Sequence, residues 1–142
     1  VTGQRCNPFY PKEEFKEQPV VSYSAATQGE NYTLVMVDPD APKHPEGKYY
    51  LHWILANIPG NDLKNGNLKS SKVISPYRGP TPPEGSGTHR YMLLLYQEPA
   101  ARPTPELSEP RRGQFDLGVW TRGLCGPISG IQFRTNFAGR EN

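Results

Sequence analysis

The sequence has few cysteines, little net charge and no long hydrophobic run, and these shortages exclude several classes of protein. Its apolar stretches fall short of the roughly 18 residues that cross a bilayer, so we expect no transmembrane segment. A net charge of +2, without a dense Lys/Arg stripe, argues against binding to nucleic acid.

Two cysteines, Cys6 and Cys125, allow at most one intrachain disulfide. On the chain-entropy model, closing a loop of about 120 residues would stabilise the fold by roughly 4 to 5 kcal/mol. The alternative is two reduced thiols. Asn31-Tyr32-Thr33 is a sequon for N-glycosylation, with Asn31 as the acceptor. Together these features favour a secreted protein, and a cytoplasmic location is the alternative.

A length of 142 residues suits one domain, which we expect to span residues 1–142. The 16 prolines and 14 glycines predict many turns and argue against long helices. Long connections rich in turn-forming residues are expected at Ala41–Lys48, Pro59–Asn67, Tyr77–Gly87 and Glu98–Pro110.

Runs of β-branched and aromatic residues with a period of two predict strands. They are Val20–Ser24, Tyr32–Val37, Tyr49–Ile58, Lys72–Ser75, Tyr91–Tyr96 and Ile131–Phe137. Three of these runs are apolar on both faces, which is typical of strands covered on each side. One short helix is expected at Gln114–Arg122. The pattern predicts an all-β dominated fold, a two-sheet antiparallel β-sandwich with long loops and at most one or two short helices.

Polar residues interrupt this apolar pattern at three places. Asp38 and Asp40 follow one strand, His52 lies within another, and His89 and Tyr91 open a third. Strand alternation puts Tyr50, His52 and Ile54 on one face, and His89, Tyr91 and Leu93 on one face of their own strand. If these strands are neighbours, the acids, imidazoles and phenol meet in one small pocket.

Three chemistries could use such a pocket. Metal binding has suitable ligand types but no short ligand spacing. Hydrolysis could use Asp38 and Asp40 as an acid and base pair, but no nucleophile is identified. An anion such as phosphate could be captured by donors from imidazole, phenol and backbone N–H groups. Nearby carboxylates would then keep the histidines protonated or accept from an amine on the ligand.

Four stretches carry a resemblance to a known family. They are YTLVMVDPDAP (Tyr32–Pro42), HWILANIPGNDL (His52–Leu63), YRGPTPPEGSGTHRYMLLLY (Tyr77–Tyr96) and GPISGIQF (Gly126–Phe133). In order and spacing they resemble the phosphatidylethanolamine-binding proteins, also called Raf kinase inhibitor-like proteins. The pair of DPDAP and G-x-HRY is the most specific element.

The resemblance implies a β-sandwich with a small anion pocket at one end. Carried over by motif, the pocket residues are Asp38, Asp40, Pro42, His52, His89 and Tyr91. Tyr50 stands near the position of a family tryptophan and could line the rim, and Gly79 could offer a backbone contact to the anion. Thr81 stands where the family often has glycine. The Ala41-Pro42 peptide is a candidate for a cis bond in the tight turn.

The function implied is binding without catalysis. The ligand would be a phosphate-bearing small molecule or phospholipid head group, or a phosphorylated peptide, held without a metal or other cofactor. A protein partner, a kinase or a serine protease, is also implied. A hydrolase or metal-dependent enzyme using the same Asp/His pocket is the alternative, and an interaction protein with a degenerate pocket is a third.

Overall fold

The computed structural model describes residues 6–99 and 109–141. After a 3-10 turn at Lys12–Phe15, the elements are β1 (Asn31–Asp38), β2 (Lys48–Pro59), α1 (Gly60–Lys64), β3 (Lys72–Ser75), β4 (His89–Gln97), β5 (Phe115–Asp116), α2 (Leu117–Trp120) and β6 (Cys125–Thr135). The expected β-dominated fold with short helices is confirmed. Within the described residues, no helix is long and apolar enough to cross a membrane.

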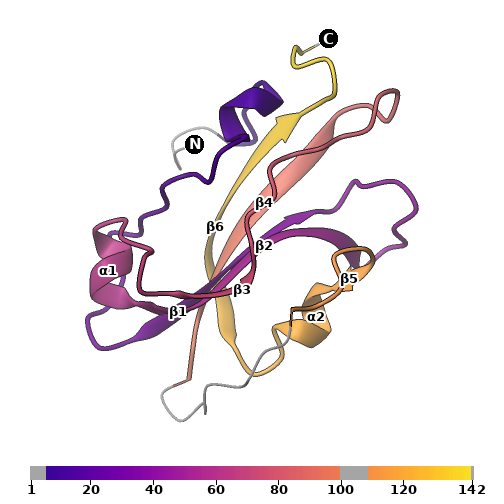
Figure 1. The fold of residues 1–142 in the computed structure, drawn as a ribbon. Coiled ribbons are helices and arrows are strands. Elements are labelled where there is room, and N and C mark those ends of the chain that lie inside the picture. Colours follow the sequence, from indigo (N-terminus) through magenta and orange to yellow (C-terminus); the bar gives the residue numbers. More distant parts are fainter. Residues whose placement is uncertain (1–5, 100–108, 142) are drawn as a thin grey trace.

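The strands form one antiparallel sheet in the order β3-β2-β1-β4-β6, and β5 adds a short pairing at the start of β2. Figure 1 shows the four long strands β1, β2, β4 and β6 running side by side. The predicted sandwich of two sheets is therefore not seen in residues 6–99 and 109–141. The structure has one sheet there, and helices and irregular segments cover both of its faces.

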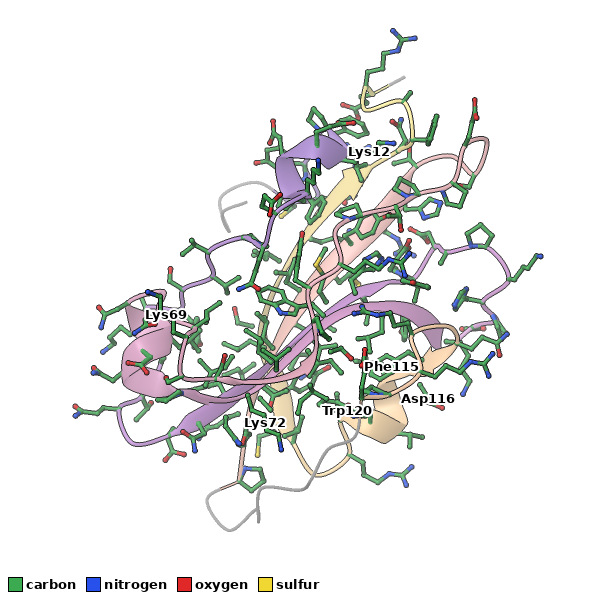
Figure 2. The ribbon with its side chains drawn as sticks, in the orientation of Figure 1. Lys12, Lys69, Lys72, Phe115, Asp116 and Trp120 are labelled. Carbon is green, nitrogen blue, oxygen red and sulfur yellow. The ribbon has the colours of Figure 1, made fainter. Side chains whose placement is uncertain are left out.

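A hydrophobic core lies on each face of this sheet. Alternate residues of β1 serve the two cores: Leu34 and Met36 join one, and Val35 and Val37 join the other. The first core is covered by the N-terminal segment, which runs along the sheet from the 3-10 turn to α1 (Figure 1). The second is covered around β5 and α2, where the rings of Phe115 and Trp120 lie 6.2 Å apart (Figure 2). This explains why the central strands are apolar on both faces.

Predicted strands at five positions overlap β1, β2, β3, β4 and β6, but the strand predicted at Val20–Ser24 is wrong. Its alternation is real, because Val21 and Tyr23 pack against the core while Val20 is 84% exposed. The segment crosses over the sheet face instead of joining its edge, and its Tyr23 N–H donates to Leu63 O of α1. Alternating apolar and polar residues indicate an extended segment with one buried side, but they do not show whether a neighbouring strand pairs with it.

Two other local predictions need correction. The segment predicted as the helix Gln114–Arg122 begins with β5, and only Leu117–Trp120 is helical, because the Asp116 carboxylate caps the helix by accepting from Val119 N–H. The expected connection Pro59–Asn67 contains α1, which Leu63 anchors in the core. Most of the expected Glu98–Pro110 loop, residues 100–108, lies outside the described residues.

The two cysteines are free and exposed, so the possible disulfide between Cys6 and Cys125 is not formed. Cys6 lies next to Asn7, which accepts a hydrogen bond from Gln132 of β6. Cys125 is the first residue of β6, seven residues before Gln132 and therefore roughly 20 Å away along the strand. A disulfide needs Cα atoms within about 7 Å. Asn31 is exposed at the start of β1, and its glycosylation stays a prediction.

Candidate functional site

One end of the sheet gathers five of the predicted site residues. Antiparallel pairing brings the end of β1 beside the starts of β2 and β4, and these ends carry Asp38, Tyr50, His52, His89 and Tyr91, which we call the polar cluster. The His52 ring lies 5.0 Å from that of Tyr50 and 5.3 Å from that of Tyr91, between centroids. The His89 ring stacks 6.4 Å from Tyr91. The predicted convergence of both imidazoles and the phenol is therefore present.

A β-bulge in β2 directs His52 into this cluster. Met36 pairs with Trp53 and the next residue of β1, Val37, pairs with Leu51, so His52 is the extra residue of the bulge. The predicted sharing of one face by His52 and Ile54 is consequently wrong. His52 contacts Tyr91 in the first core, whereas Ile54 belongs to the second core.

Two arginines bind the backbone groups that the bulge leaves without a strand partner. Arg112 accepts from Leu51 N–H, and its guanidinium donates to the carbonyls of Leu51 and His52 at 3.1 and 3.0 Å. The Arg78 backbone N–H donates to the His52 carbonyl at 2.9 Å. A second guanidinium nitrogen of Arg112 donates to Pro76 O at 2.7 Å. Arg112 therefore connects the segment before β5 to the strand that carries His52.

Asp38, His89 and Ser86 form one hydrogen-bonded chain. His89 Nδ1 lies 2.7 Å from Asp38 Oδ2, and His89 Nε2 lies 2.8 Å from Ser86 Oγ. The Ser86 hydroxyl has a single proton and lies 2.6 Å from Pro83 O, a carbonyl that can only accept. Ser86 therefore donates to Pro83 and accepts from His89 Nε2–H, while Nδ1–H donates to the carboxylate. With a proton on both nitrogens, His89 is an imidazolium.

The electrostatics agree with this proton assignment. Burial by itself lowers the pKa of His89, but the hydrogen bond and charge of Asp38, with the charge of Asp40, outweigh it and the net pKa is raised. The exposed fractions of the two side chains are 1% for His89 and 4% for Asp38. The pair is thus a buried ion pair with no net charge.

His52 has the opposite protonation state. Its Nδ1 lies 2.7 Å from the carbonyl of Arg78, so Nδ1 carries the proton and donates it. Burial is the main cause that lowers the pKa of His52 to about 4, against the Arg78 hydrogen bond and the Asp38 charge, which raise it. At neutral pH, His52 is therefore uncharged and presents a lone pair at Nε2. Within the described chain, no hydrogen bond reaches that atom.

The Tyr91 hydroxyl is buried and has no hydrogen-bond partner among the described residues. Burial is the main cause that raises the pKa of this phenol, and the charge and the nearby carboxylate of Asp38 raise it further, so the hydroxyl keeps its proton. A buried hydroxyl without a partner costs roughly 1 to 3 kcal/mol. The cluster thus contains one acceptor, at His52, and one hydroxyl, at Tyr91, with unused hydrogen-bonding capacity.

Asp40 lies at the edge of the cluster and serves the chain itself. Its carboxylate accepts from Arg90 Nε and a terminal guanidinium nitrogen, both at 2.9 Å, and from Arg90 N–H at 2.8 Å. The side-chain hydrogen bond of Arg90 is the main cause that lowers the pKa of Asp40. Asp40 N–H in turn donates to Asp38 Oδ1. The two acids of the DPDAP turn therefore have separate partners, His89 and Arg90.

Two predicted residues lie outside the cluster. Pro42 is exposed, and its carbonyl lies 2.9 Å from His44 Nδ1. The Ala41-Pro42 peptide is not cis: among the described residues, the cis peptide is Gly126-Pro127. Gly79 is required by packing, because a Cβ there would lie 2.6 Å from Phe15 O of the 3-10 turn.

A cover formed by Tyr50 and Arg78 lies over His52. The Arg78 guanidinium donates to the Tyr50 hydroxyl at 2.7 Å, and the Tyr50 ring lies against His52. Arg78 also lines an adjoining hollow of about 530 Å³ between the 3-10 turn and the segment that ends at Pro83. Lys12 and Lys16 stand on the rim of this hollow, and Figure 2 labels Lys12.

Sequence reasoning missed four residues that shape the site. They are Arg78, Ser86, Arg90 and Arg112. Arg90 stands inside the HRY motif, and the opposite charge of the DPDAP acids was an available signal. Arg112 follows Arg111 in the sequence, a pair typical of a solvated surface, and nothing in the sequence places Arg112 beside a bulge.

The comparisons with known proteins agree on one family. A family model described as "Phosphatidylethanolamine-binding protein" matches residues 7–122. "Putative odorant-binding protein A5" of Drosophila melanogaster is 40% identical over 91 residues, 63% of this chain and 40% of that protein. The match therefore spans less than half of that relative's length.

Solved structures show the same fold. The phosphatidylethanolamine-binding protein from Plasmodium vivax has a TM-score of 0.70 at 21% identity, over 96% of this chain and 81% of that one. The CG7054 solution structure has a TM-score of 0.64 at 33% identity, over 93% of this chain and 76% of that one. A carboxypeptidase Y inhibitor, complexed with its cognate proteinase, has a TM-score of 0.66 at 20% identity, over 92% of this chain and 76% of that one. The first and third likenesses, below 25% identity, bear on the fold alone.

Proposed function

Because the chain belongs to the phosphatidylethanolamine-binding protein family, we propose that it binds a phosphate-bearing ligand at the polar cluster and does not convert it chemically. The observation that carries this proposal is the unused hydrogen-bonding capacity of His52 Nε2 and the Tyr91 hydroxyl inside a buried polar site. Phosphate oxygens and hydroxyls are groups that such a pair would bind. The ligand is a small phosphate-bearing molecule or the head group of a phospholipid.

The proton arrangement supports binding over hydrolysis. Ser86, His89 and Asp38 have the order of a nucleophile, base and acid, as in serine hydrolases. However, His89 already holds two protons and cannot act as a base, and the Ser86 hydroxyl donates to Pro83. His52, with its pKa lowered to about 4, is too weak a base to activate water efficiently at neutral pH. The described residues contain no group of three or more ligands converging as a metal site would.

Ligand entry requires the cover to move. His52 is 1% exposed and Tyr91 is 0% exposed. Because Tyr50 lies against His52 and is bonded to Arg78, we expect these two side chains to move when a ligand enters. Arg78 is itself exposed and is held to Tyr50 by one hydrogen bond, which is a small barrier to opening. In the open state, its guanidinium becomes available to an anion at the mouth of the site.

Histidine NMR tests the proposal directly. Adding inorganic phosphate or O-phosphoethanolamine to protein with 15N-labelled histidine should shift the ring signals of His52 and His89 in a saturable manner. Tyr91→Phe should weaken the binding. Tyr96→Phe is the matched control, because Tyr96 is equally buried but lies in the second core. Ring signals of His52 and His89 that stay unchanged at millimolar ligand would contradict the proposal.

The kinase or serine protease partner and the secreted location stay predictions. The likeness to the carboxypeptidase Y inhibitor is one of fold, and the missing Cys6–Cys125 bridge removes one of the two arguments for secretion. Inhibition assays against a panel of serine proteases and kinases would test the partner, and the location of the tagged protein in cells would test secretion.

A further inference from the structure

The unused groups of the polar cluster specify more than a negative charge. We propose that the ligand is a phosphate monoester bound with one proton on its phosphate, and that this P–OH donates to His52 Nε2. The inference rests on the proposed function and narrows the ligand class at the same site. It separates monoesters from sulfate and from phosphodiesters, the head groups of diester phospholipids included, which carry no proton on the anionic group at neutral pH.

The geometry of His52 carries the argument. Its Nδ1–H is committed to the Arg78 carbonyl at 2.7 Å, so Nε2 can only accept unless the ring gains a proton. An anionic oxygen placed against this lone pair would be repelled. A P–OH group at the same place forms a hydrogen bond. The Tyr91 hydroxyl, which retains its proton beside the Asp38 carboxylate, can donate to another phosphate oxygen.

The groups around His52 keep it from taking a proton in the empty site. Those facing it are Asp38 from β1, Tyr50 from β2, Tyr91 from β4, Arg78 from the segment after β3 and Arg112 from the segment before β5. Asp38 is the single carboxylate among them, and it is already paired with the His89 imidazolium. The two guanidinium groups disfavour a further positive charge. The proton of the complex must therefore arrive with the ligand or accompany its binding.

This proton requirement predicts a specific pH dependence. A phosphate monoester has a second pKa near 6, so its monoanion becomes scarce above that pH. If the monoanion is the bound species, affinity should fall about 20-fold between pH 6.5 and pH 8.0. Binding of the dianion from solution at pH 8.0 should take up about one proton per ligand.

Methyl phosphate and dimethyl phosphate form a suitable probe pair, because they differ by one methyl group and by the presence of the titratable proton. Calorimetric titrations at pH 6.5 and pH 8.0, each in two buffers with different heats of ionisation, give affinity and proton uptake. We expect methyl phosphate to bind at least tenfold more tightly than dimethyl phosphate at pH 6.5, and this ratio to decrease at pH 8.0. Any effect of His89 ionisation acts on both ligands and cancels in the ratio.

The outcomes separate the inference from the proposed function. Equal binding of methyl phosphate, dimethyl phosphate and sulfate, with the same pH dependence, would overturn the monoester inference and leave phosphate binding intact. No binding of inorganic phosphate or methyl phosphate at either pH would overturn the proposed function itself.

Two further measurements address His52 directly. His52→Gln should lose the extra pH dependence of methyl phosphate. His44→Gln, which replaces the imidazole 6.2 Å from the Tyr50 ring at the edge of the cluster, should retain it. Should the variant fail to fold, the 15N signal of His52 in the unaltered protein still decides. It must report an unprotonated Nε2 without ligand and a hydrogen-bonded but still unprotonated Nε2 with methyl phosphate, and a protonated Nε2 in the complex would overturn the monoester inference. A signal that is unchanged at saturation would refute the assignment.

Discussion

His52 should make the folded protein sensitive to mild acid. Burial lowers the pKa of this imidazole to about 4 in the folded state, while an unfolded chain has the ordinary value of about 6.5. Between these two pH values, the unfolded state binds a proton that the folded state does not. The free energy of unfolding therefore decreases as pH falls from 6.5 to 4. The difference of about 2.5 pKa units corresponds to about 3 kcal/mol.

The other two shifted groups of the site, His89 and Asp40, act mainly outside this window. The pKa of His89 is raised, so its contribution is fully present below about 6.5 and is lost as pH rises through the folded-state value. The pKa of Asp40 is lowered, mainly by the hydrogen bond from Arg90, and its contribution is lost only as pH falls below 3.8, the ordinary value of an aspartate. Loss of stability between pH 6.5 and pH 4 is consequently attributed to His52.

Urea unfolding of the wild type and of His52→Gln at pH 7.0, 5.5 and 4.0 measures this contribution. Glutamine keeps an N–H donor for the Arg78 carbonyl but does not titrate. The wild type should lose about 3 kcal/mol more than the variant between pH 7.0 and pH 4.0. His44→Gln is the matched control for removing an imidazole. Parallel stability profiles for the wild type and His52→Gln over this range would refute the reasoning.

Three other changes have definite expected outcomes. Asp38→Asn removes the carboxylate that keeps His89 charged, so His89 should lose its proton at neutral pH and the variant should lose about 1 to 3 kcal/mol in urea unfolding; an unchanged stability would contradict the buried ion pair. Arg112→Met removes donors from three carbonyls and should accelerate amide hydrogen exchange around the β2 bulge; unchanged exchange would mean that the bulge does not depend on Arg112. Arg78→Ala releases Tyr50 and should increase the association rate of inorganic phosphate measured by NMR exchange; an unchanged rate would argue against the cover.

The strands were predictable because burial leaves a direct mark on their sequences. Tyr32–Val37 and Tyr91–Tyr96 place apolar side chains on both faces of their strands, and both faces are covered in the structure. The same mark could not show how many sheets exist. A strand covered by irregular segments and one covered by a second sheet bury the same side chains, so the sandwich and the single sheet were indistinguishable.

The clustering of the polar residues was predictable, but their protonation was not. DPDAP and HRY identified Asp38 and His89, and the structure pairs them. That His52 is neutral while His89 is charged depends on which carbonyl or carboxylate each ring reaches. These partners come from segments 26 and 51 residues away in the sequence. The bulge in β2 was also not predictable, because the residues from Leu51 to Ile54 contain no glycine or proline that would indicate an interruption of the strand.

The contribution of β1 to both hydrophobic cores has a consequence for how the protein unfolds. Since neighbouring residues of this central strand belong to opposite cores, neither core can be lost without exposing one side of the same backbone. We expect one unfolding transition shared by both cores, with the amides of β1 among the last to exchange with deuterium. Deleting a single residue from β1 would exchange the occupants of the two cores, and should be far more damaging than any point substitution at its ends.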